Sequence, residues 1–415
     1  MSAQTLATGL SPKLDVSDPD LWPDDACLDV FARMRVEDPV HYCEDSAYGP
    51  YWSITRYDDI MAVDTNHQAF SSEAILGGIV IADEITESDD PNDVMRNFIS
   101  MDPPDHTAVR KSVNPIVNRP NLANFESLIR KRTHDLLDDL PVDEPFDWVS
   151  HVSIELTTQM LATLFDFPFE DRHKLTRWSD VVTAEPGSDV VGSKEERFAE
   201  LMECLQYFTM LKEQRRGNHG GMDLVSMLAT SPATMDLSPY GFLANIGLLI
   251  VGGNDTTRNS MTSGVYAMSK NPDQLAQLKA DRDLLPNMVS EIIRWQTPLA
   301  HMRRTAVRDE VVGGKTIREG DKVVMWYLSG NRDESIFGDD ANDFDITRHN
   351  ARRHMSFGFG IHRCMGLRLA ESQLRILWEA ILERYDRIEV LNEHGRVRSN
   401  FVRGYTDMQV RLVPK

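Results

Sequence analysis

Cysteine is scarce in this chain of 415 residues, which has only four: Cys27, Cys43, Cys204 and Cys364. They lie far apart and form no C-x-x-C pair, which argues against a zinc site or a disulfide framework and favours a reducing cytoplasm. The N-terminus lacks the basic-then-apolar segment of a signal peptide. The longest apolar run, residues 242–251, is too short to span a bilayer. A cytoplasmic protein without a membrane anchor is therefore expected.

Basic residues are also in the minority, with 44 Lys and Arg against 65 Asp and Glu and a net charge of -21. This balance argues against general binding to nucleic acid or to anionic membranes. No internal repeat and no Gly/Ser linker divides the chain, and 41% hydrophobic residues suffice for a large core. We expect one domain over residues 1–415, in which residues 1–25 form an extended lead-in.

Hydrophobic periodicity predicts a mainly α fold with a minor β region. The predicted helices are 27–36, 104–118, 121–138, 151–165, 168–184, 193–216, 222–229, 238–270, 272–280, 284–296 and 366–385. Strand patterns occur at 40–43, 51–55, 310–317 and 321–327, and the C-terminal residues 386–415 mix short strands with loops. The acidic run at 83–93 lacks the order of an EF-hand, so a solvated loop is favoured over a calcium site.

The stretch at 357–366, F-G-F-G-I-H-R-C-M-G, presents Cys364 just ahead of a predicted helix. Gly358 and Gly360 permit a turn and a close backbone approach. Free N–H groups at a helix N-terminus stabilise a thiolate, which suits a metal ligand. A cysteine without such a context is more often a small buried hydrophobe. A dinucleotide-binding loop is excluded because Arg363 occupies the third glycine position. The hypothesis is an axial thiolate on a haem iron.

Every fixed position of this stretch matches F-G-x-G-x-H-x-C-x-G, the haem-binding loop of the cytochrome P-450 family of haem-thiolate monooxygenases. The chain resembles that family over essentially its whole length. The resemblance implies the cytochrome P-450 fold and haem b (protoporphyrin IX iron), with Cys364 as the iron ligand and Phe357 against the sulfur side of the haem. It also implies insertion of one oxygen atom from O2 into a C–H bond of a hydrophobic substrate.

A second motif, G-G-N-D-T-T at 252–257, lies inside the predicted helix 238–270. Two glycines within a helix cost about 1 kcal/mol each relative to alanine. The hydroxyl of Thr256 can bond the carbonyl of Gly252 and open the helix locally. Asp255 and Thr256 are then predicted to form a proton relay. The alternative is close helix packing through small residues, with Asp255 in a surface ion pair; similarity to the oxygen-activating helix of the family favours the relay.

The resemblance also implies contacts to the two haem propionates, which need cationic or donor partners. His106 and Arg110 are four residues apart at a helix start and share one face. Arg304 and His362 occupy the remaining propionate positions of the family. The adjacent Arg303 stays open as an alternative to Arg304.

A third motif, Glu291-x-x-Arg294, is weak in isolation because exposed pairs with this spacing are common. In the family the pair is buried and joined by a downstream arginine, here Arg348. The three residues are expected to have a structural role beneath the haem-binding loop.

The region around Cys364 is basic within an acidic chain. Between 348 and 375, Glu371 is the single acid against six arginines: Arg348, Arg352, Arg353, Arg363, Arg368 and Arg375. Such a patch would steer an acidic electron donor. Because no reductase domain fits in this length, we expect a monomer that receives electrons from NAD(P)H through a separate ferredoxin and ferredoxin reductase.

The local sequences at 252–262, 301–306 and 369–378 resemble those of the bacterial branch of the family that hydroxylates terminal methyl groups of medium-chain alkanes and fatty acids. Five apolar residues are expected to line the substrate pocket: Leu248, Val251, Leu299, Met302 and Phe401. Such a lining suits terpenes or steroids equally. The haem-binding loop would also serve a haem-thiolate sensor, a binding protein or a peroxide-driven peroxygenase. The Asp255–Thr256 pair argues against all three, because none of them needs a proton relay.

Overall fold

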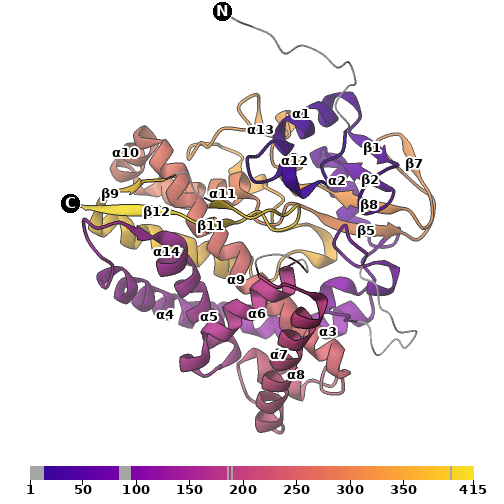
Figure 1. Cartoon of the computed structure of the whole chain (residues 1–415), viewed down its shortest axis with the longest axis horizontal. Helices are drawn as coiled ribbons and strands as arrows, with labels where there is room; N and C mark the ends of the chain where they lie inside the picture. The colour runs from indigo at the N-terminus through magenta and orange to yellow at the C-terminus, as the bar shows by residue number, and fades with distance from the viewer. Residues whose placement is uncertain (1–13, 84–94, 185–186, 188–189, 393–394) are drawn as a thin grey trace, which may run out of the picture.

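The computed structural model describes residues 14–83, 95–184, 187, 190–392 and 395–415. Its central element is the helix α9 (Pro239–Lys270), which crosses the middle of the molecule (Figure 1). Ser238 caps its start, with the side-chain oxygen accepting a hydrogen bond from the backbone N–H of Gly241 at 3.1 Å. The helix is buried along most of its length, as its all-round apolar and small residues require.

The remaining helices confirm the mainly α prediction. They are α1 (Cys27–Glu37), α2 (Tyr57–Thr65), α3 (Asp105–Val113), α4 (Arg119–Asp138), α5 (Glu155–Phe165), α6 (His173–Thr183), α7 (Lys194–Arg215), α8 (Leu224–Thr230), α10 (Pro272–Ala280), α11 (Leu285–Gln296), α12 (Tyr327–Gly330), α13 (Glu334–Phe337) and α14 (Leu367–Arg384). The predicted helix 104–118 divides, because Pro115 has no N–H to donate and the chain continues after Val113 as a 3-10 turn.

The largest sheet has the strand order β1-β2-β8-β5-β3 and joins N-terminal strands to strands 250 residues further along. Its members are β1 (Val40–Cys43), β2 (Tyr51–Ile54), β8 (Lys322–Met325), β5 (Met302–Ala306) and β3 (Phe70–Ser71). The predicted strand 321–327 ends at Met325, since Tyr327 begins α12. The sequence did not predict β5, which pairs antiparallel with both β8 and β3.

Three smaller β elements complete the fold. β4 (Phe146–Asp147), β12 (Gln409–Pro414) and β9 (Tyr385–Val390) form one sheet, while β6 (Glu310–Val312) pairs with β7 (Lys315–Ile317) and β10 (Gly395–Arg396) with β11 (Tyr405–Asp407). The described end of the predicted lead-in is not loosely attached. Val16 and Trp22 are buried, and Trp22 packs against Phe31 and Trp326.

Candidate active site

Cys364 differs from the other three cysteines, which are buried, because its side chain is exposed. It lies at the end of a loop whose backbone closes on itself, the N–H of Cys364 donating to the carbonyl of Phe357 at 2.8 Å. Protein atoms still surround the sulfur closely, so that burial raises the pKa of the thiol. An exposed side chain in such surroundings lines an open interior space. The N–H groups of Gly366 and Leu367 and the guanidinium of Arg110 act against burial and lower this pKa.

The glycines of the loop serve its approach to α2. Gly358 and Gly360 have φ angles of 63° and 64°, which favour glycine. A Cβ atom on Gly360 would lie 2.7 Å from the carbonyl oxygen of Asp64. The N–H of Phe359 donates to Oδ2 of Asp64 at 2.8 Å. The close backbone approach is therefore made to the C-terminal turn of α2, and this contact fixes the position of the loop relative to that helix.

The imidazole of His106, on α3, meets that of His362, in the Cys364 loop. The rings of His106 and His362 are 4.5 Å apart, and both ring nitrogens of His106 and Nδ1 of His362 are buried without a hydrogen-bond partner among the described residues. Burial lowers the pKa of both imidazoles, that of His362 to about 2. Nε2 of His362 lies 3.1 Å from Oγ of Ser72. Arg110 donates to the carbonyl oxygens of Ile361 and Arg363.

The structure separates Arg303 from Arg304. Side chains alternate along a strand, so the two arginines of β5 point to opposite faces. Arg304 donates to Oδ1 of Asp64 at 2.8 Å and is close enough to His362 to lower the pKa of that imidazole. Arg303 instead contacts residues 76–83. The face that carries His362 thus includes Arg304.

Gly252 and Thr256 lie four residues apart on α9. Gly252 is exposed although its neighbour Val251 is buried, and no atom lies within 4 Å of where its Cβ would be. Oγ1 of Thr256 donates to the carbonyl of Gly252 at 3.0 Å, as the spacing predicts. The predicted local opening does not occur, because α9 is one uninterrupted helix. The open space comes from the absent side chain rather than from a helix break.

Asp255 is fully buried and faces α6 instead of solvent. Its Oδ1 accepts a hydrogen bond from Ser179 at 3.1 Å and lies 3.0 Å from the guanidinium of Arg258, while Oδ2 has no hydrogen-bond partner among the described residues. Arg258 also pairs with the partly exposed Asp180 at 2.8 Å. Burial raises the pKa of Asp255, Arg258 lowers it and Asp180 raises it further. A carboxyl with a raised pKa and a free oxygen is suited to hold and pass on a proton.

The three residues of the predicted structural role are brought together. Glu291 and Arg294 are fully buried, with both carboxylate oxygens 2.7 Å from guanidinium nitrogens of Arg294. Nε of Arg348 donates to Oε1 of Glu291 at 3.2 Å, and the N–H of Asp345 adds a bond of 3.0 Å.

The candidate pocket residues lie in two groups. Leu248 and Val251 belong to α9, the first half-buried and the second buried. Leu299, Met302 and Phe401 are half-buried at the start of β5 and in the C-terminal loop. The second group is held together by an isolated bridge between Leu299 and Val402 and by the N–H of Ala300, which donates to the carbonyl of Phe401.

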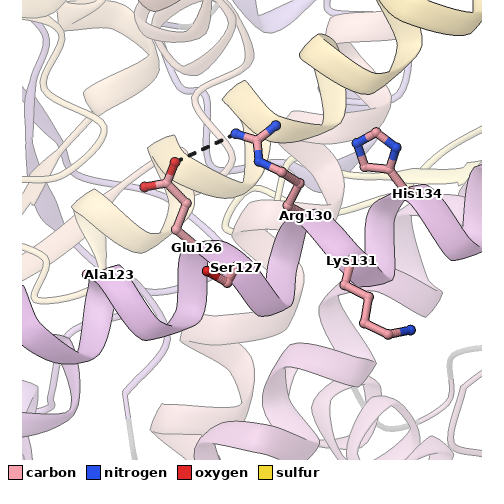
Figure 2. Close-up of a pocket in the computed structure, with 6 residues that line it drawn as sticks. All are labelled: Ala123, Glu126, Ser127, Arg130, Lys131 and His134. Carbon is pink, nitrogen blue, oxygen red and sulfur yellow. Dashed lines mark ion pairs between the residues drawn. The ribbon is translucent and has the colours of Figure 1, made fainter.

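A hollow on the outside of α4 is separate from this region. It is lined by Ala123, Glu126, Ser127, Arg130, Lys131 and His134, and Figure 2 shows Lys131 pointing away from the other side chains. Glu126 and Arg130 are engaged by α14, through Arg375 and Glu379 at 2.8 Å each. Within the described ranges, no group of three or more His, Cys, Asp or Glu side chains suits a metal ion.

Several residues of the site were not predicted: Asp64, Ser72, Ser179, Asp180 and Arg258. Asp64, Ser72 and Ser179 each contact a site residue that is distant in the sequence. Arg258, on α9, and Asp180, on α6, form an ion pair with each other. No local pattern marks the first four of these residues. The i, i+3 spacing of Asp255 and Arg258 on one helix face was the one available signal.

The residues present fit a haem. Cys364 is exposed on its loop, imidazoles without hydrogen-bond partners among the described residues and an arginine that donates to carbonyls lie next to this loop, and α9 leaves open space at Gly252. This fold and site define a haem-thiolate enzyme. The chain belongs to the cytochrome P-450 family, whose model matches residues 190–397. It is a monooxygenase of that family, and its cofactor is a haem-thiolate iron.

Individual relatives cover nearly the whole chain. Linalool 8-monooxygenase from Pseudomonas putida is 37% identical over 97% of this chain and 99% of its own length. A methyl-branched lipid omega-hydroxylase from Mycobacterium bovis is 31% identical over 94% of this chain and 92% of its own. Among solved structures, CYP153D17 from Sphingomonas sp. PAMC 26605 is 46% identical, with a TM-score of 0.88 and coverage of 96% of this chain and 98% of that one. No helix in the described part of the chain combines the length and apolar character needed to cross a membrane.

Proposed function

We propose that this monooxygenase hydroxylates the terminal methyl groups of medium-chain alkanes or fatty acids. The observation that carries the proposal is the likeness to CYP153D17 at 46% identity over 96% of the chain, because the local sequences at 252–262, 301–306 and 369–378 resemble the branch that attacks terminal methyl groups. The similarity to a methyl-branched lipid omega-hydroxylase supports attack at a chain end. The apolar side chains of Leu248, Val251, Leu299, Met302 and Phe401 suit a hydrocarbon.

A terpenoid is the second candidate substrate. It is favoured by the similarity to linalool 8-monooxygenase. A cytochrome P-450 of Mycobacterium marinum, solved in complex with pseudoionone, is 29% identical with a TM-score of 0.85. Apolar residues line pockets for either class, so the two candidates differ in the shape of the pocket rather than in its polarity.

When bound, the haem supplies the iron at which O2 is activated, and thiolate ligation favours cleavage of the O–O bond. The chain contributes the rest. We infer that Cys364 supplies the thiolate, that His106, Arg110, Arg304 and His362 hold the propionates, and that Phe357 covers the sulfur side.

On the oxygen side, Asp255 holds a proton in a buried site, and the hydroxyl of Thr256, which donates to the carbonyl of Gly252, offers its oxygen lone pairs beside the open space at that glycine. The apolar residues exclude water and orient the substrate. Glu291, Arg294 and Arg348 hold the structure beneath the loop.

Electrons are proposed to come from NAD(P)H through a ferredoxin reductase and an acidic ferredoxin. Two of the six arginines near Cys364 are engaged within the protein, Arg348 with Glu291 and Arg375 with Glu126. The other four, Arg352, Arg353, Arg363 and Arg368, are exposed. They leave a basic surface on an acidic protein, which favours an acidic partner. We place the enzyme in the cytoplasm as a monomer.

A screen for binding by the change in haem spin state tests the substrate. n-Octane and decanoic acid are compared with linalool and testosterone at equal concentration. The proposal expects the linear compounds to give the largest shifts and the terminal alcohol as the main product. Larger shifts with linalool would move the assignment to the second candidate.

Two substitutions test the roles at the iron. Cys364→Ala should remove the red-shifted Soret band that reduced, CO-bound haem-thiolate proteins show. Thr256→Ala should divert electrons from product to hydrogen peroxide, and Thr256→Ser, which keeps the hydroxyl, should restore coupling. Unchanged coupling in Thr256→Ala would remove Thr256 from the relay.

A further inference from the structure

The side chain of Arg303 is enclosed by a loop that nothing in the established activity uses. Residues 76–83, here called the Arg303 loop, turn their oxygen atoms toward its guanidinium. Oδ1 of Asp83 lies 2.6 Å from Nη1 and the carbonyl oxygen of Leu76 3.2 Å from Nη2, with longer contacts of 3.5 Å to the carbonyls of Val80 and Ala82. The loop therefore folds around one delocalised cation.

Further bonds fasten the Arg303 loop to the sheet. The backbone N–H of Arg303 donates to the carbonyl of Ile79 at 2.8 Å, and the hydroxyl of Thr305 to that of Leu76 at 2.8 Å. Nζ of Lys322, on the neighbouring strand β8, donates to the carbonyl of Ile81 and to Oδ2 of Asp83, both at 3.1 Å. Arg303 and Lys322 are buried, so their charges depend on these acceptors.

The approach is close enough to restrict the sequence of the loop. Gly77 has a φ of 106°, a conformation that side chains rarely adopt. A Cβ atom at this position would lie 2.1 Å from Nη2 of Arg303. A side chain at position 77 would therefore displace the guanidinium of Arg303 from its place in the loop. Lysine is no substitute for the arginine, because a single ammonium lacks the planar fork that reaches several oxygens at once.

The Arg303 loop connects two parts of the proposed site, the Cys364 loop and the candidate substrate contact Phe401. Before it, Oγ of Ser72 lies 3.1 Å from Nε2 of His362, which places this end beside the Cys364 loop. At the other end, the N–H of Ile81 donates to Nε2 of His301, whose Nδ1 donates to the carbonyl of Asn400. The ring of His301 packs 5.2 Å from that of Phe401, a candidate substrate contact.

We propose that Arg303 holds residues 76–83 as a fixed wall of the substrate pocket and thereby helps to restrict oxidation to the end of the substrate chain. Arg303 is a positioning residue, since it reaches the pocket only through the loop. The inference rests on the proposed function, because it assigns the selectivity of that site. A wall fixed at both ends keeps the more reactive internal C–H bonds away from the iron, which terminal attack requires.

The test compares Arg303→Lys with Asp83→Asn, and uses Arg308→Gln as a matched control. Arg308 belongs to an exposed pair with Glu310 outside the loop. Amide hydrogen exchange of a peptide covering residues 74–83 is measured with and without haem. Loss of charge-assisted bonds should raise that exchange about tenfold in Arg303→Lys, with a smaller rise in Asp83→Asn and none in the control. The holoenzymes are then given n-octane, and the ratio of 1-octanol to 2-octanol is measured.

The proposal expects that ratio to fall about twofold or more in Arg303→Lys. Faster exchange with an unchanged ratio would show that the loop is merely structural and would overturn it. Unchanged exchange would overturn the anchoring role itself. If Arg303→Lys does not fold, as judged by the CO-bound Soret band, Asp83→Asn decides by the same two criteria. Failure of the wild type to oxidise n-octane would refute the proposed substrate instead, and the product ratio would then be measured with linalool.

Discussion

Removal of the buried carboxylate of Glu291 should destabilise the fold strongly. Glu291→Gln keeps the shape of the side chain but leaves the guanidinium groups of Arg294 and Arg348 without their shared anion. Breaking a buried ion pair from one side costs about 3–5 kcal/mol, because an uncompensated charge remains in the interior. For a chain of 415 residues the unfolding entropy is about 0.9 kcal/mol/K, so the Tm should fall by about 3–6 °C.

The assay is thermal unfolding followed by circular dichroism, with the CO-bound Soret band as a check on haem retention. Glu37→Gln is the matched control, because Glu37 pairs with Arg33 at 3.0 Å on the surface of α1, four residues apart. Exposed pairs of this kind contribute little to stability, so the loss of this one should leave the Tm within about 1 °C. Equal effects of the two substitutions would refute the conclusion that burial gives Glu291 its structural role.

Three further predictions concern α9 and His301. Gly253→Ala should be less stable in urea than Gly252→Ala by about 1 kcal/mol or more, because the added methyl would lie 2.7 Å from Cδ2 of Leu161 at the first position and meets nothing within 4 Å at the second. Burial raises the pKa of Asp255, so the folded state holds its proton to higher pH than the unfolded state and its ionisation is destabilising. Asp255→Asn should therefore gain stability over the wild type as pH rises from about 3.8 through the raised pKa. A difference that does not change with pH would contradict this. Burial lowers the pKa of His301 from 6.5 to about 4, so the stability that its neutral ring provides should be lost as pH falls through that range. His301→Asn should remove this part of the acid dependence in urea titrations.

The sequence predicted the residues that break local rules. Paired glycines inside a helix, a cysteine after a glycine-rich turn and an acid next to an alcohol all need a reason that local structure does not provide. In the structure, Gly252 and Cys364 both border open interior space. The mainly α fold could be predicted because its helices follow the local rule of hydrophobic periodicity.

What the sequence could not show depends on partners far along the chain. M-R-R-T-A has little β propensity, and it forms β5 because β8 and β3 provide strands on both sides. Without that strand, nothing determines that Arg303 and Arg304 face opposite ways. The partners of Asp255 were missed for a similar reason, because Ser179 and Asp180 lie about 75 residues away and reach it only through the packing of α6 on α9.

Asp64 distinguishes the two arginines that are predicted to contact the propionates, because it pairs with one of them. This buried carboxylate accepts hydrogen bonds from Arg304, from the hydroxyl of Tyr327 and from the N–H of Phe359 at 2.8 Å each. Arg304 is therefore already neutralised and ties the sheet to α2, so its loss would leave Asp64 buried without a counter-charge. Arg110 donates to two carbonyl oxygens and, within the described part of the chain, to no carboxylate, although it lies close enough to Cys364 to lower the pKa of that thiol. We infer that Arg110 supplies the electrostatic attraction for a propionate, whereas Arg304 is held by the fold and contributes its remaining N–H donors.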